Sequence, residues 1–118
     1  VTGDGGFMFN VQEMATAVLH KIPLVTILFN DNTFGNVKRN QKLDYNERYI
    51  ACDLLNPDFM KLADSFGMMG LRVNSAEGLQ GAMEKAFAED GPVLIEVEVG
   101  AMPSLWPLMP LKRAKEDD

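Results

Sequence analysis

The sequence of 118 residues predicts an α/β fold, a three-layer sandwich built on a mainly parallel sheet. Short apolar runs rich in β-branched residues alternate with stretches whose apolar residues recur every three or four positions. Glycine and proline separate these stretches. Alternating strands and helices of this kind form parallel sheets through right-handed crossovers. The length allows one domain at most, which we place at residues 1–100, followed by a proline-rich tail over residues 101–118.

The first part of the chain is predicted to be strand, helix and strand. Residues 1–2 end a strand that enters a glycine-rich turn over residues 3–6. From Val11 the apolar residues form one helical stripe, and Pro23 ends it. Residues 24–29, Leu-Val-Thr-Ile-Leu-Phe, form a nearly continuous apolar run. Such a run is typical of a strand that is buried on both faces of a parallel sheet.

The middle of the chain is less regular. Residues 30–35 have turn composition, and residues 36–55 are polar and weakly periodic, so we expect a loop there with some helix. A clearer helix follows. Asn56 is a plausible N-cap, Pro57 suits the first helical position, and Gly67 suits the C-terminal cap.

The last part of the chain is predicted to be strand, helix and strand. The short strand covers residues 70–73, and Asn74 with Glu77 resembles the capping box of a second helix. Residues 93–99 then alternate, with valines and isoleucine on one side and glutamates on the other. We therefore expect one face of this last strand to meet solvent or another chain.

Composition excludes several classes of partner. The net charge of −6 argues against nucleic acid or an anionic membrane as a partner. No apolar run approaches membrane-spanning length. The single cysteine, Cys52, permits no internal disulfide, which fits a reducing compartment such as the cytoplasm. We expect Cys52 to be a small packed or partly exposed side chain without a catalytic role. The chain shows neither an initiator methionine nor a signal peptide, so we expect a fragment.

Two loops are candidates for a ligand site, because open parallel sheets bind ligands at the carboxyl ends of their strands. One is Gly-Asp-Gly-Gly at residues 3–6, and the other is Asn-Asp-Asn-Thr at residues 30–33. Glycines let backbone N–H groups approach a phosphate, and a helix N-terminus favours an anion. No Gly-Lys-Ser/Thr follows, which excludes a Walker-type loop, and the glycine spacing fits a dinucleotide fingerprint poorly.

A carboxylate within the first loop points to a metal. Asp4 would lie where an anion binds, which is unfavourable unless a cation lies between them. Mg²⁺ prefers oxygen ligands and commonly joins a carboxylate to phosphates. Asp31 supplies a second oxygen, the backbone carbonyl of Thr33 a third, and phosphate oxygens with a water complete six. For either loop alone, ordinary turn formation by these residues is the competing explanation.

The spacing of the two loops resembles a known motif. Gly3-Asp4-Gly5, followed after 24 residues by Asn30-Asp31, looks like the thiamin-diphosphate motif. Residues 3–14, 54–63 and 91–97 resemble the acetolactate synthase group of that family. The resemblance extends to about Val99. It implies the thiamin-diphosphate-binding fold, truncated at the N-terminus, with residues 1–100 forming a partial domain for thiamin diphosphate and Mg²⁺.

The resemblance also implies roles for single residues. By position, the metal ligands are Asp4, Asp31 and the carbonyl of Thr33. The family usually has Asn in place of Asp31, and we expect metal binding to tolerate the carboxylate, with a changed dependence on Mg²⁺. The other cofactor-binding positions are Gly3, Gly5, Gly6, Asn32, Phe34 and Gly35.

The function implied is that of a thiamin-diphosphate-dependent enzyme that decarboxylates and ligates a 2-oxo acid such as pyruvate. The intact enzyme is expected to be a homo-oligomer, a dimer or tetramer. The resemblance places the activating glutamate in another domain, so we expect no catalytic residue in this chain and no activity from it alone. A non-ligating 2-oxo acid decarboxylase is one alternative. A non-catalytic module for cofactor binding or dimerisation is another.

Overall fold

The computed structural model describes residues 1–100 of the chain, so the predicted tail over residues 101–118 lies outside the described residues. The elements in chain order are β1 (Thr2–Gly3), α1 (Asp4–Met8), α2 (Glu13–Leu19), β2 (Val25–Asn30), α3 (Gly35–Asp44), α4 (Phe59–Ser65), β3 (Met69–Val73), α5 (Ala76–Phe87) and β4 (Val93–Glu98). The division into a domain and a tail stays a prediction.

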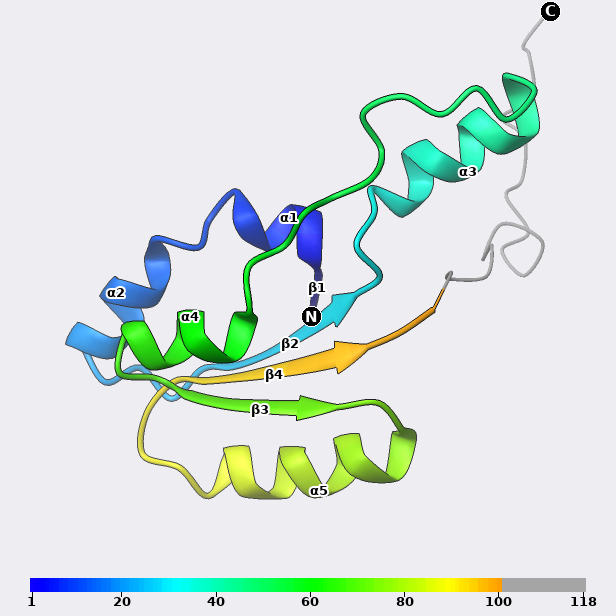
Figure 1. The fold of residues 1–118 in the computed structure, drawn as a ribbon. Coiled ribbons are helices and arrows are strands. Elements are labelled where there is room, and N and C mark those ends of the chain that lie inside the picture. Colours follow the sequence, from blue (N-terminus) through cyan, green and yellow to red (C-terminus); the bar gives the residue numbers. More distant parts are fainter. Residues whose placement is uncertain (101–118) are drawn as a thin grey trace, which may run out of the picture.

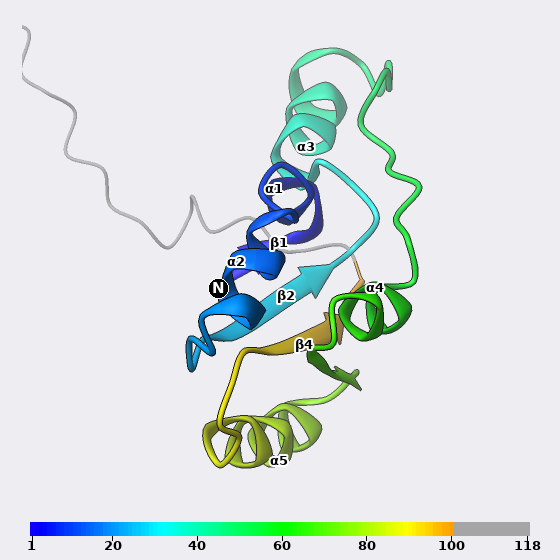
Figure 2. The same ribbon diagram turned by 90° about the vertical axis from the view of Figure 1, so that its left-hand side faces the viewer.

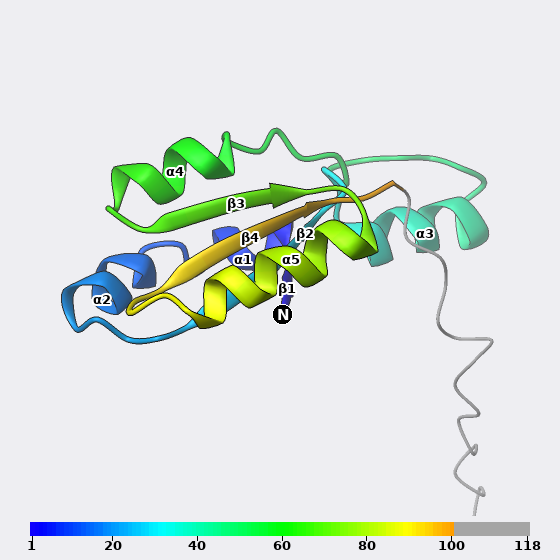
Figure 3. The same cartoon turned by 90° about the horizontal axis from the view of Figure 1, so that it is seen from below.

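The four strands form one parallel sheet in the order β1-β2-β4-β3. Helices α1, α2 and α4 cover one face of the sheet (Figure 1). Helix α5 covers the other face, as the views along the sheet and from below show (Figures 2 and 3). The predicted three-layer α/β fold with a parallel sheet is confirmed. Because β1 and β2 are neighbours, the two candidate loops leave the same edge of the sheet.

The sheet separates two apolar cores. The core under α2 and α4 consists of Met14, Leu28, Phe59, Ala63, Met68 and Leu94. The core under α5 consists of Ala82, Ala86, Val93, Ile95 and Val97. Strand β4 contributes to both cores because its side chains alternate between the two faces. The last strand in sequence is therefore the most buried one.

This arrangement corrects two expectations about the strands. The face of β4 that carries the glutamates is expected to meet solvent or another chain, and this is wrong for Glu96, which is only 2% exposed, whereas Glu98 at the end of the strand is exposed. Strand β4 lies between β2 and β3, and α4 covers this face next to Leu94. Strand β2 is less buried than expected, because in it only Leu28 is fully buried. Its outer neighbour, β1, is two residues long and covers little of it.

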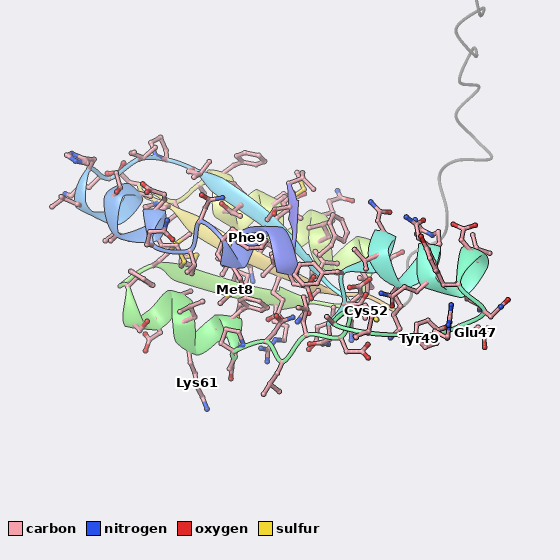
Figure 4. The ribbon with its side chains drawn as sticks, turned by 90° about the horizontal axis from the view of Figure 1, so that it is seen from above. Met8, Phe9, Glu47, Tyr49, Cys52 and Lys61 are labelled. Atoms are coloured by element: carbon pink, nitrogen blue, oxygen red, sulfur yellow. The ribbon has the colours of Figure 1, made fainter. Side chains whose placement is uncertain are left out.

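The start of α4 differs from the predicted start. The N-cap is Asp58, whose carboxylate accepts hydrogen bonds from the backbone N–H groups of Met60 and Lys61. Asn56 is therefore not the cap, and its side chain lies in the candidate site instead. Gly67 follows the helix with φ of +71°, as expected for a glycine after a helix end. The side chain of Lys61 points from α4 into solvent (Figure 4).

Other helices also begin at residues that differ from the predicted ones. Ser75, not Asn74, caps α5, and its hydroxyl accepts a hydrogen bond from the N–H of Gly78 at 3.0 Å. The predicted turn over residues 3–6 is mostly the first turn of α1. The weakly periodic segment contains a regular helix, α3, which has no buried residue. None of the helices in residues 1–100 is both long and apolar enough to cross a membrane.

Candidate functional site

The two glycine- and asparagine-rich loops meet at the carboxyl ends of β1 and β2. The register pairs Gly3 with Phe29, so Asp4 follows β1 beside the residues that leave β2. A cavity of about 390 Å³ opens between them. Its lining includes Gly3, Asp4, Asp31, Thr33, Gly35, Asn36 and Arg39. The structure thus brings the predicted metal ligands to one cavity.

Asp4 is buried at the start of α1, with only 3% of its surface exposed. Its Oδ1 accepts a hydrogen bond from the backbone N–H of Gly5 at 2.9 Å. Its Oδ2 accepts one from Nδ2 of Asn56 at 2.6 Å. Each carboxylate oxygen therefore has one protein donor and can accept further contacts, because a carboxylate oxygen has more than one acceptor site.

Asp31 uses one oxygen to hold its own loop. Its Oδ1 accepts hydrogen bonds from the backbone N–H and the hydroxyl of Thr33, both at 3.0 Å. Between them, Asn32 adopts the left-handed conformation with φ of 57°, which asparagine tolerates better than most residues. The Oδ2 of Asp31 lies 3.3 Å from the position that a Cβ on Gly35 would take. Oδ1 of Asp31 therefore closes the turn, and Oδ2 takes no part in these two hydrogen bonds.

The remaining cofactor-binding predictions divide into two groups. Gly3 and Gly35 line the cavity with the carboxylates, whereas the described lining does not include Gly5, Gly6 or Phe34. Gly5 instead faces Phe34, because a Cβ at this position would lie 2.5 Å from Cε1 of that ring. Gly5 is therefore required for packing between α1 and the second loop. Gly6 is exposed at the surface of α1.

The donor set suits a metal that also takes ligands from a phosphate. Within residues 1–100, no group of three or more His, Cys, Asp and Glu side chains could hold a metal ion. Two carboxylates and one backbone carbonyl would leave about half of an octahedral shell for other oxygen ligands. This is the pattern that Mg²⁺ shows where it joins a protein to a phosphate group.

Residues 52–54, for which the sequence predicted no contact with the site, hold the second loop in place. The N–H of Phe34 donates to the carbonyl of Cys52, and the N–H of Leu54 donates to the carbonyl of Asn32, both at 2.8 Å. Thr33 and Asp53 form an antiparallel bridge between these bonds. Cys52 lies where the returning segment passes the start of α3 (Figure 4). It is buried, which agrees with the packed one of the two expected environments.

The sheet face beneath the site changes from apolar to polar along its length. Leu28 and Leu94 lie in the core, whereas the next positions on the same face, Asn30 and Glu96, carry polar groups. Nδ2 of Asn30 donates to Oε1 of Glu96 at 2.8 Å, and Nε of Arg72 donates to Oε2 at 2.8 Å. The buried charge of Glu96 is thereby paired, as buried charges must be. The hydrogen bond to Glu96 raises the pKa of Arg72.

Cations lie next to the side of the cavity that carries Asp31. An adjoining cavity of about 490 Å³ shares Asp31, Thr33 and Gly35 with it. The cations that line it come from α3 and are Lys38, Arg39 and Lys42. Nζ of Lys38 donates to Asp53 at 2.6 Å, and this hydrogen bond raises the pKa of Lys38. The positive groups favour an anionic ligand at this end of the sheet.

Comparisons with known proteins agree on one family. Residues 1–97 match the family described as "Thiamine pyrophosphate enzyme, C-terminal TPP binding domain". The chain is 36% identical over 111 residues to the acetolactate synthase isozyme 2 large subunit of Escherichia coli (strain K12). The aligned residues make up 93% of this chain and 20% of that protein. It is 44% identical over 99 residues to an acetolactate synthase of Bacillus subtilis (strain 168), covering 84% and 17%. The chain thus spans about a fifth of the length of these relatives.

Solved structures show the same fold. The thiamine diphosphate-dependent 4-hydroxybenzoylformate decarboxylase of Rhodococcus jostii RHA1 matches with a TM-score of 0.79 and 32% identity, over 86% of this chain and 19% of that chain. Benzoylformate decarboxylase from Polynucleobacter necessarius has a TM-score of 0.79 at 24% identity, over 86% of this chain and 19% of that chain, and supports the fold alone.

Proposed function

Because the chain belongs to the thiamine pyrophosphate enzyme family, through the C-terminal cofactor-binding domain of its members, we propose that it holds thiamin diphosphate by means of Mg²⁺. Asp4, Asp31 and the backbone carbonyl of Thr33 bind the metal, and the metal binds the diphosphate. The observation that carries this proposal is the burial of Asp4 in the lining of a cavity that Asp31 also lines. A buried carboxylate beside an anionic ligand needs a cation between them.

We further propose the reaction of the intact enzyme. It acts on a 2-oxo acid such as pyruvate, by decarboxylation and carboligation, in the manner of an acetolactate synthase. The bound cofactor supplies the carbanion chemistry, and this chain positions the diphosphate end. The intact enzyme is a cytoplasmic homo-oligomer, a dimer or tetramer. The similarity to acetolactate synthases over most of this chain supports the proposed reaction.

The proposed binding site is tested by removing one carboxylate. In the intact enzyme, Asp4→Ala should abolish Mg²⁺-dependent binding of thiamin diphosphate, as measured by calorimetric titration with and without the metal. Asp64→Ala is a matched control, because Asp64 is an exposed carboxylate on α4 away from the cavity. If Asp4→Ala retained the cofactor with the same dependence on Mg²⁺ as the parent, the metal assignment would be wrong.

A second candidate reaction is decarboxylation without ligation. It is supported by the similarity to a 4-hydroxybenzoylformate decarboxylase at 32% identity over 86% of this chain. Product analysis of the intact enzyme with pyruvate separates the two reactions. Acetolactate as the main product supports ligation, whereas free acetaldehyde as the main product supports decarboxylation alone.

A further inference from the structure

We propose that Asn56 is a positioning residue for the metal ligand Asp4. The inference rests on the proposed function, in which the carboxylate of Asp4 binds Mg²⁺. Asn56 lies far from Asp4 in the sequence, yet its amide makes the shortest hydrogen bond to that carboxylate, 2.6 Å from Nδ2 to Oδ2. Asn56 does not bind the metal itself. It fixes the direction in which Asp4 presents its oxygens.

The carboxylate of Asp4 is held from two sides. The N–H of Gly5 donates to Oδ1 at 2.9 Å, and Nδ2 of Asn56 donates to Oδ2. Two donors on different oxygens fix the rotation of the carboxylate about its side chain, because rotation would lengthen at least one of the bonds. Without Asn56, only the backbone donor next in sequence would remain.

The orientation of the Asn56 amide is itself determined by its surroundings. Its Nδ2 also lies 3.0 Å from Oδ1 of Asn30 and 3.3 Å from Oδ1 of Asn32. Three oxygens around one nitrogen require the amide to present its N–H groups to this side. The carbonyl oxygen of the Asn56 side chain must then face the opposite way.

The network continues to a buried ion pair in the sheet. Asn30 can offer its oxygen to Asn56 because its own Nδ2 is bound to Oε1 of Glu96 at 2.8 Å. The other oxygen of Glu96 accepts from Nε of Arg72 at 2.8 Å. The buried carboxylate thus fixes the Asn30 amide, which in turn supports Asn56. This path links the centre of the sheet to the proposed metal ligand.

The backbone also holds Asn56 in place. Proline follows it, which restricts the preceding residue to extended conformations. Two residues earlier, the N–H of Leu54 is bound to the carbonyl of Asn32 at 2.8 Å. Asn56 is therefore attached to the second loop before it and to the start of α4 after it. A side chain on such a backbone is suited to positioning another group.

The metal determines how much this positioning matters. Mg²⁺ requires nearly ideal octahedral geometry, whereas Ca²⁺ accepts variable geometry and longer bonds. Removing a group that orients a metal ligand commonly weakens metal affinity by about 10–100-fold. Loss of the Asn56 donor should therefore weaken Mg²⁺ much more than Ca²⁺. A purely structural role would affect both metals to the same extent.

The test uses the intact enzyme freed of metal and cofactor. Asn56→Leu removes the donor at similar volume, and Asn56→Ala is the second variant if the first does not fold. Thiamin diphosphate binding is titrated with Mg²⁺ and, separately, with Ca²⁺, by calorimetry. Asn74→Leu is the matched control, since Asn74 is exposed and lies outside the network. The unfolding midpoint without metal reports any general loss of stability.

We expect the half-saturating concentration of Mg²⁺ to rise by about tenfold or more in the Asn56 variants. The value for Ca²⁺ should rise by about threefold at most, because its coordination shell is more flexible. An unchanged Mg²⁺ requirement, or an equal rise for both metals, would overturn the positioning role. The Asp4→Ala variant distinguishes a failure of the proposed function from a failure of the positioning role alone. If it binds like the parent, the proposed function fails; if it loses binding while the Asn56 variants keep it, only the positioning role fails.

Discussion

Asp31 combines two tasks in one side chain, because one oxygen closes the turn to Thr33 and the other is available to a ligand. An asparagine has a single side-chain oxygen for both tasks. We therefore expect Asp31→Asn in the intact enzyme to keep cofactor binding but with a changed Mg²⁺ requirement. Asp31→Leu loses both contacts and should lose Mg²⁺-dependent binding. A Mg²⁺ titration of both variants checks this, and a parent-like curve for the leucine variant would remove Asp31 from the metal shell.

Gly5 is a second residue with a testable role. An added methyl would lie 2.5 Å from Cε1 of Phe34, so the ring would have to move. We expect Gly5→Ala to destabilise the protein by about 1–3 kcal/mol, the usual cost of overpacking. Without the Phe34 ring the clash is absent, so Gly5→Ala should cost less stability in a Phe34→Ala background than in the parent. Thermal unfolding of the single and double variants measures this; equal stability of Gly5→Ala and the parent would show that the ring moves freely.

Single residues also show where sequence reasoning succeeds and where it stops. The sequence predicted that Asp4 and Asp31 lie together at the ends of neighbouring strands, and both line one cavity. Their binding to a metal stays a prediction. The sequence predicts that Asn56 is a helix cap. An asparagine followed by proline gives the same sequence pattern whether its side chain caps a helix or binds a distant carboxylate. Only the tertiary contact of 2.6 Å with Asp4 distinguishes the two roles.

At the scale of elements, α4 begins at a carboxylate that has two functions. Asp58 caps the helix and also accepts a hydrogen bond from the guanidinium of Arg72 at 2.9 Å. Desolvation raises the pKa of Asp58, but the hydrogen bonds from Met60, Lys61 and Arg72 together outweigh it and lower the pKa. The ionised form is therefore favoured in the folded state. The cap connects α4 to the ion pair that lies under the site.

This lowered pKa predicts a pH dependence. A depressed carboxylate contributes stability above its unfolded pKa, here near 3.8, and the contribution is lost as the pH falls through the folded pKa. Asp58→Ala should therefore melt below the parent at neutral pH. The difference should be constant down to about pH 5 and then shrink in more acidic buffer. A difference that persists unchanged at the acidic end would show that the charge of Asp58 is not involved.

Strand β4 shows why the buried polar end of an element is hard to predict. Alternation of apolar residues with Glu96 and Glu98 is the same pattern for a half-exposed strand and for a central strand that ends in a site. The sheet order decides between them, and that order depends on pairing between segments far apart in the chain. The presence of a strand at these residues, by contrast, could be predicted, because local composition is sufficient to identify a strand.

At the scale of the whole molecule, large apolar side chains remain exposed in the described part of the chain. Leu43 is 70% exposed, Ile50 76% and Leu55 102%. Strand β1 at the sheet edge has two residues, so β2 has little cover on that side. Exposed apolar surface and open sheet edges both favour association.

We therefore expect the 118-residue chain, produced alone, to associate with itself and to bind thiamin diphosphate weakly. Sedimentation velocity measures the association. A thermal-shift titration with Mg²⁺ and cofactor measures binding, because a ligand of the folded state raises the melting temperature. A monomer whose melting temperature rises strongly at micromolar cofactor would show that this chain forms the site without further protein surface.

The close approach of Phe34 and Cys52 has a consequence for how this family can diversify. Their backbone groups meet at 2.8 Å, so the stretch between them, which includes α3, leaves and rejoins the domain at one point. Doubling the length of a flexible loop costs only about 0.6 kcal/mol in closure entropy. Insertions, deletions or exchange of this stretch between relatives can therefore accumulate without moving the turn that carries Asp31. The length of this stretch can therefore change during evolution while the Asp31 turn keeps its place on the sheet.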